Sequence, residues 1–128
     1  MYSDVERLIE EAKADQGVLA VILFGSSARG ETTPTSDIDV CLVLPLGQDA
    51  EADCLHMRTK YLAYDNLDLR IYQQLPLYVR QRVLKEGHVL SCRDVDMLYR
   101  IAYLTVQAFE DFKPIYHQYL EEVAHAGS

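Results

Sequence analysis

The residues best suited to do chemistry begin at a glycine–serine turn, Gly25-Ser26, that follows an apolar run. Glycine lets a ligand approach the backbone closely, and free N–H groups at the start of a helical turn bind phosphate oxygens. Ser26 would donate through its N–H and its hydroxyl, and Arg29, about one turn later, could reach the same anion with its planar fork. The turn therefore predicts a phosphate site, although the same residues also occur where a strand simply ends.

Two aspartates, Asp37 and Asp39, follow this turn after ten intervening residues. Because side chains alternate along a strand, both carboxylates face one side, with Cα atoms about 7 Å apart. Carboxylates so placed repel each other unless a hard cation such as Mg²⁺ lies between them, as in two-metal phosphoryl-transfer sites. The pair therefore predicts a metal site, and the alternative for an isolated Asp-x-Asp is a solvated strand edge.

A third carboxylate, Asp68, lies in the middle of a predicted strand, where a charged side chain needs compensation. If this strand lies beside that of Asp37, Asp68 completes a cluster of carboxylates, as a metal ligand or as the base that takes a proton from an attacking hydroxyl. The alternatives are a salt bridge with Arg70 on the same face or an exposed sheet face. Asp65, in the preceding turn, is the weaker candidate for the third acid.

The elements that must position these residues follow from hydrophobic periodicity and from the positions of glycine and proline. The segment 67–72 alternates strictly, so its three apolar residues share one face: Leu67, Leu69 and Ile71. The pattern predicts helices over about 3–16, 49–64, 76–86 and 94–123, with Pro114 kinking the last or opening another, and strands over 18–24, 37–44, 67–72 and 88–91. This order predicts one α/β (α+β) domain, 1–128, with a small mixed β-sheet flanked by helices and a helical C-terminus.

The composition restricts the possible partners. The chain of 128 residues has a formal net charge of −8, which disfavours direct nucleic-acid binding and suits a basic protein partner. No membrane-spanning run or secretory signal is recognisable, so we expect no membrane association and a cytoplasmic location. The three cysteines are too scattered for a disulfide framework or a zinc site, and Cys41 is expected in the core.

The run Gly-Ser-x-Ala-Arg-Gly from Gly25 to Gly30, followed by Ser-Asp-Ile-Asp ending at Asp39, resembles the signature of the DNA polymerase beta-like nucleotidyltransferase superfamily, and of its minimal (MNT) branch in particular. The resemblance covers essentially the whole chain and implies the nucleotidyltransferase fold. It implies that ATP is the substrate, with its triphosphate held by Gly25 and Ser26 and possible help from Arg29. It also implies that Mg²⁺, as two ions, is bound by three carboxylates: Asp37, Asp39 and Asp68. Val40 replaces the commoner leucine and needs only to be apolar.

The C-terminal part, including residues 108–116, resembles MNT antitoxins of the MntA type, which are encoded beside HEPN proteins. This resemblance implies a hetero-oligomeric complex with a HEPN ribonuclease toxin (HepT-like) and transfer of AMP from ATP to a tyrosine of that toxin. The alternatives are a nucleotidyltransferase that modifies a small molecule, and an antitoxin that acts by binding alone. The aromatic side chains of the last helix are expected mainly in the core, with a partner surface as the alternative, and Lys113 has no assigned role.

Overall fold

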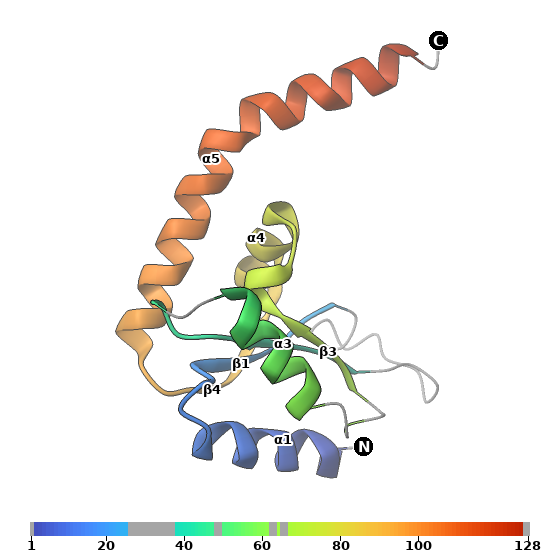
Figure 1. Ribbon diagram of the computed structural model, residues 1–128. Helices are drawn as coiled ribbons and strands as arrows, with labels where there is room; N and C mark the ends of the chain where they lie inside the picture. Colours follow the sequence, from blue (N-terminus) through green and yellow to red (C-terminus); the bar gives the residue numbers. More distant parts are fainter. Residues whose placement is uncertain (1, 26–37, 48–49, 62–63, 65–66, 127–128) are drawn as a thin grey trace.

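A small sheet lies between two pairs of helices in the computed structural model (Figure 1). The structure describes residues 2–25, 38–47, 50–61, 64 and 67–126. The elements, in chain order, are α1 (Tyr2–Ala14), β1 (Ala20–Leu23), β2 (Ile38–Val43), α3 (Ala50–Lys60), β3 (Leu67–Ile71), the 3₁₀ turn η1 (Tyr72–Gln74), α4 (Leu77–Glu86), β4 (His88–Cys92) and α5 (Val95–Ala126). The predicted mixed sheet flanked by helices, with a helical C-terminus, is confirmed. The helix predicted over 49–64 ends earlier, at Lys60.

The strand order is β3-β2-β1-β4. β1 pairs antiparallel with both β2 and β4, whereas β2 pairs parallel with β3. Parallel neighbours need a crossover connection, and α3 supplies it between β2 and β3. As a result, the end of β1 and the beginnings of β2 and β3 lie at the same end of the sheet.

Both faces of the sheet are covered, which explains why β1 and most of β2 are nearly continuous apolar runs. Helices α1 and α3 cover one face, where the largest buried members include Leu8, Val21, Leu42, Tyr61 and Ile71. Helices α4 and α5 cover the other face, where the buried members include Ile22, Cys41, Val43, Tyr72, Val83 and Ile101. Val40 is fully buried among apolar neighbours, as its position requires.

Two sequence predictions about side-chain placement are confirmed in these cores. Leu67 and Ile71 are buried on the α1/α3 face, and Leu69 packs against the same cluster. Cys41 is a free, buried thiol, and burial raises its pKa to about 12, so it stays protonated and unreactive at neutral pH. Alternation therefore puts Asp68 and Arg70 on the α4/α5 face of the sheet.

Helix α5 is continuous over 32 residues and contains Pro114, so the proline does not open a second helix. The helix axis changes direction in its C-terminal half, which projects beyond the rest of the chain (Figure 1), as expected for a helix with an internal proline. The expectation that the aromatic side chains of this helix belong to the core is wrong for Tyr99 and Tyr103, which are 70% and 62% exposed. Phe109 and Phe112 are half-buried, and the side chains of 113–120 lie outside the described residues. Neither α5 nor another helix in the described part of the chain is long and apolar enough to cross a bilayer.

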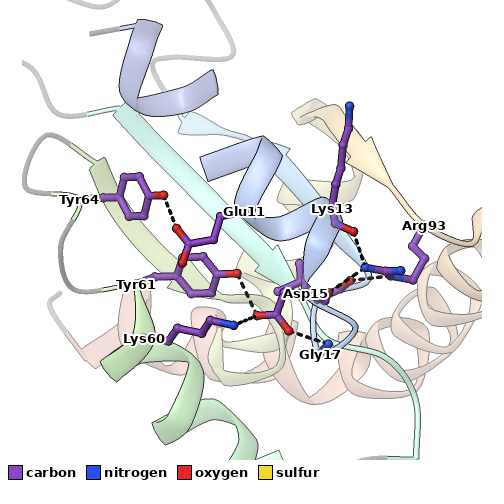
Figure 2. A network of polar contacts seen from close by, with 9 residues as sticks. Glu11, Lys13, Asp15, Gly17, Lys60, Tyr61, Tyr64 and Arg93 are labelled. Carbon is purple, nitrogen blue, oxygen red and sulfur yellow. Dashed lines mark hydrogen bonds and ion pairs between the residues drawn. The ribbon is translucent and has the colours of Figure 1, made fainter. Parts of the chain in front are cut away.

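Polar contacts fix the C-terminal end of α1 to the rest of the fold (Figure 2). The Asp15 carboxylate accepts hydrogen bonds from Lys60 Nζ at 2.7 Å, Tyr61 Oη at 3.0 Å and the Gly17 N–H at 2.9 Å. Burial alone would raise the pKa of Asp15, but these donors outweigh it and lower that pKa. Arg93 donates to the carbonyl oxygens of Lys13 and Asp15 at 2.8 and 2.9 Å, so it caps carbonyls that the helix leaves unpaired.

Candidate functional site

Three segments that carry predicted site residues meet at one end of the sheet. Leu23, at the end of β1, pairs with Val40 of β2, and the N–H of Phe24 donates to the Asp39 carbonyl oxygen at 3.0 Å. The turn at Gly25 is therefore held beside Asp39. In β3, Asp68 is the direct Cα partner of Asp39.

The parallel register places the Asp39 and Asp68 carboxylates on the same face of the sheet. Neighbouring strands lie about 4.8 Å apart, and directly paired residues project to the same side. This is the α4/α5 face, because Cys41 and Tyr72, which follow at even spacing, are both buried there. Both aspartates are only half-buried. The strand adjacency on which the role of Asp68 depended is thus confirmed.

Gly25 cannot be replaced by another residue without disturbing Asp39. Its φ of +67° lies in the left-handed region, which favours glycine. An ideal Cβ at this position would lie 2.5 Å from Oδ2 of Asp39. The absence of a side chain at Gly25 therefore lets the backbone turn approach the carboxylate, and it keeps the space beside that carboxylate open to a ligand.

The salt bridge that the sequence offered as an alternative for Asp68 is also present. Arg70 Nε lies 3.1 Å from Asp68 Oδ1, and the arginine side chain is 58% and the aspartate side chain 39% exposed. An exposed ion pair of this kind contributes at most about 1 kcal/mol, so it does not by itself account for a carboxylate at this position. The two interpretations of Asp68 are compatible, because the ion pair and the neighbouring Asp39 occur together.

The other predicted site residues, Ser26, Arg29 and Asp37, lie outside the described residues, as does Asp65. Within the described part of the chain, no three side chains of the His, Cys, Asp or Glu type come together as a metal site. Asp39 and Asp68 nevertheless supply carboxylate oxygens on one face, and these are the ligands that Mg²⁺ prefers. The donor set fits magnesium, and the assignment of Asp37, Asp39 and Asp68 as its ligands stays a prediction.

Two hollows border this end of the sheet, and they contain two helix arginines that the sequence did not mark, Arg58 and Arg82. One hollow, of about 430 Å³, is lined by Asp68 together with Arg58, Arg70 and Gln74. The other, of about 200 Å³, adjoins Gly25 and includes Arg82 of α4. An arginine on a helix surface has no distinguishing sequence pattern, so only the tertiary structure could show that these side chains lie beside the site.

Taken together, the fold and the site fit the nucleotidyltransferase class of proteins. Residues 6–96, which include Gly25, Asp39 and Asp68, match the model of the family described as "Polymerase beta, Nucleotidyltransferase". This match covers more than half of the chain, and the protein belongs to that family.

More particular similarities are to protein adenylyltransferases and to toxin–antitoxin proteins. A candidate protein adenylyltransferase of Methanocaldococcus jannaschii is 35% identical over 85 residues, which are 62% of this chain and 61% of that protein. The chain thus matches about six-tenths of the length of this curated relative.

Solved structures with the same fold include a toxin–antitoxin complex with AMP-PNP. Its TM-score is 0.67 at 18% identity, and the match covers 95% of this chain and 97% of the other. Another is the complex of a tri-AMPylated Shewanella oneidensis HEPN toxin with its MNT antitoxin, with a TM-score of 0.65, 18% identity and coverage of 95% and 94%. At these identities the likeness establishes the fold, and it extends over nearly the whole chain.

Proposed function

We propose that this protein is a magnesium-dependent adenylyltransferase that transfers AMP from ATP to a tyrosine hydroxyl of a HEPN-family toxin and so neutralises the toxin. The observation that carries the proposal is the in-register pairing of Asp39 with Asp68 beside the turn at Gly25. Membership of the nucleotidyltransferase family supports the reaction class. The similarity to a candidate protein adenylyltransferase supports a protein acceptor.

The order of the strands supports the role proposed for each group. Gly25 lies beyond β1, Asp39 in β2 and Asp68 in the edge strand β3, so the three positions follow one another across the sheet. The triphosphate would bind at the glycine–serine turn through backbone N–H groups and Ser26, with Arg29 as a further contact. Asp37, Asp39 and Asp68 would hold Mg²⁺, as two ions, which would offset charge on the α-phosphate and align the attacking and leaving oxygens.

The acceptor would enter from the β3 edge. In an in-line displacement, the attacking and leaving oxygens lie on opposite sides of the α-phosphorus. With the triphosphate on the Gly25 side, the attacking hydroxyl comes from the Asp68 side, where the hollow with Arg58, Arg70 and Gln74 is open. Asp68 would accept the hydroxyl proton as the new O–P bond forms, and the bond to the β-phosphate oxygen breaks to release pyrophosphate.

The proposed partner agrees with the charge of the chain and with its structural relatives. A net charge of −8 suits a partner with basic surface and disfavours direct nucleic-acid binding. Structures with the same fold are described as complexes with toxins, one of which is a tri-AMPylated HEPN protein. We therefore assign the acceptor to a HEPN protein encoded next to this one.

The test is to incubate the purified protein with Mg²⁺, α-labelled ATP and the adjacent HEPN protein, and to measure label and mass on that partner. We expect mass increases in steps of AMP, located on a tyrosine by peptide mass spectrometry. The Asp37→Asn/Asp39→Asn variant should abolish transfer, whereas Glu10→Gln, which neutralises an exposed carboxylate on α1, should leave it unchanged.

Each negative result has a definite meaning. Omission of Mg²⁺ without loss of transfer would contradict the role of the carboxylates. A stable complex that acquires no label would favour neutralisation by binding alone. Label on a small hydroxylated molecule, and none on the HEPN protein, would favour the small-molecule alternative.

A further inference from the structure

Exposed apolar side chains form a stripe along the first half of α5. Its members lie at positions i, i+4, i+8 and i+11, which share one side of a helix; they are Val95, Tyr99, Tyr103 and Val106, and all are exposed. We call these residues the α5 stripe. It lies on the side of α5 turned away from Ile101 and Thr105, which face the interior. The Tyr103 hydroxyl accepts a hydrogen bond from Gln107 Nε2 at 2.9 Å, which orients that ring along the helix surface.

A hollow of about 350 Å³ extends the α5 stripe toward the sheet. It lies between β4, α4 and α5, and its apolar lining includes Val89, Val95, Tyr99 and Ala102. Val89 belongs to the edge strand β4 and is itself exposed. Exposed apolar residues that occur singly need no explanation, whereas a contiguous apolar surface with a hollow is typical of an interaction site.

Charges at the ends of the stripe argue against a second copy of this chain as the occupant. Asp96 lies beside the N-terminal end and Glu110 at the C-terminal end, and both are exposed. If two copies paired through the stripe, a parallel arrangement would bring like residues together, and an antiparallel one would bring Asp96 against Glu110. Either arrangement opposes carboxylate to carboxylate, and the exposed Arg100 beside the stripe offsets only part of the charge of Asp96, Glu110 and Asp111. The two copies would also each carry a net charge of −8. A partner with Lys or Arg at both ends of an apolar segment fits the same surface without this conflict.

We propose that the α5 stripe and its hollow bind the partner protein through an apolar segment flanked by basic residues. The identity of that partner as the HEPN protein rests on the proposed function. β4 and β3 form opposite edges of the sheet, so this surface lies near the edge opposite to Asp68, although α5 covers the face to which Asp68 projects. Docking and AMP transfer therefore use separate residues, so a change at the catalytic carboxylates should abolish transfer without loss of docking.

The test compares the Tyr99→Asp/Tyr103→Asp variant with Leu55→Asp. Leu55 is a matched control, because it is 69% exposed, close to the 70% of Tyr99, and lies on α3, which covers the opposite face of the sheet. Calorimetry with the HEPN protein should show a Kd raised by about thirtyfold or more for the stripe variant. The control should stay within about twofold, and circular dichroism checks that both variants are folded.

A charge variant tests the proposed flanking residues independently of the tyrosines. Glu110→Lys should weaken the complex by about threefold to tenfold in low salt and by less at high ionic strength, because rim charges are screened. A Kd that is unchanged or lower in the Glu110→Lys variant would contradict a basic segment at that end.

The outcomes separate this inference from the proposed function. A stripe variant that binds the HEPN protein as tightly as the wild type overturns the surface assignment and leaves AMP transfer untouched. An Asp39→Asn variant that binds normally but transfers no AMP supports the separation of docking from chemistry. A wild-type protein that forms no complex with the HEPN protein overturns the assigned partner, and self-association in sedimentation that the stripe variant abolishes overturns the argument against a second copy.

Discussion

The carboxylates near the two ends of β1 have contrasting surroundings. At the beginning of β1, Asp15 is surrounded by donors from Lys60, Tyr61 and the Gly17 backbone, and Arg93 caps the adjacent helix end (Figure 2). At the other end, Asp39 and Asp68 lie side by side on a half-buried face, and the ion pair of Asp68 with Arg70 is exposed. A carboxylate saturated by protein donors holds the fold together, whereas neighbouring carboxylates on a half-buried face are what the proposed cation site requires.

The largest effect expected from this comparison is at Asp39. Asp39→Asn removes a proposed metal ligand while almost preserving the shape of the side chain, so transfer of AMP should fall by about a thousandfold or more. The melting temperature should change by less than about 3 °C. Transfer assays and calorimetric unfolding of the same preparation give both numbers, and a variant that unfolds would show that Asp39 is structural like Asp15.

Gly25→Ala should lower transfer by about a hundredfold, because the new Cβ displaces the Asp39 carboxylate and a small misplacement in a site of this kind is costly. Gly47→Ala is the matched control. Gly47 also has a positive φ, of +86°, but an added Cβ there meets nothing within 4 Å. Both variants should lose about 1 kcal/mol of stability from the strained backbone, and equal activities in the two would disprove the role of close approach at Gly25.

Arg93→Ala should lower the free energy of unfolding by about 2 kcal/mol, because carbonyl oxygens at the end of α1 lose charge-assisted hydrogen bonds. Arg93→Lys should recover part of this loss. Transfer per folded molecule should not change in either variant, since Arg93 lies at the opposite end of β1 from the site. Urea unfolding measures the change in stability, and active-site titration measures transfer per folded molecule. A fully folded Arg93→Ala protein with reduced transfer would contradict the division of the molecule into two regions.

The Asp15 network should give the protein a defined dependence on pH. Its donors lower the pKa of Asp15 in the folded state, so their stabilisation is fully present above the unfolded pKa of about 4 and is lost as the pH falls through the lower folded value. The difference in unfolding free energy between wild type and Asp15→Asn should be constant from neutral pH down to about pH 5, and then shrink toward pH 3. A difference that stays constant over the whole range would show that the ion pair is not the cause.

The smallest effect is expected at Arg70. Arg70→Ala removes an exposed ion pair and should change the free energy of unfolding by less than about 0.5 kcal/mol. Denaturant titration of Arg70→Ala and Arg93→Ala under the same conditions compares their losses of unfolding free energy directly. A loss as large as that of Arg93→Ala would mean that Asp68 is held in a structural network after all.

Local pattern in the sequence was sufficient for the element types and for the faces of the strands. The alternation of residues 67–72 put the leucines and Ile71 on the core face and Asp68 on the other, because side-chain direction in a strand depends only on position. The glycine–serine turn and the paired aspartates pointed to the family that the comparison with known families then established. The roles of all the predicted site residues stay predictions: Gly25, Ser26, Arg29, Asp37, Asp39 and Asp68.

Only the tertiary structure decided which segments meet. The register that pairs Asp39 with Asp68 depends on how two strands dock after a helical crossover, and no local pattern specifies such a pairing. Nothing in the sequence distinguished Asp15 or Arg93, whose partners come from distant elements. The exposure of Tyr99 and Tyr103 was likewise decided by packing, because a helix with apolar residues on more than one side can bury only the side that the sheet and α4 cover.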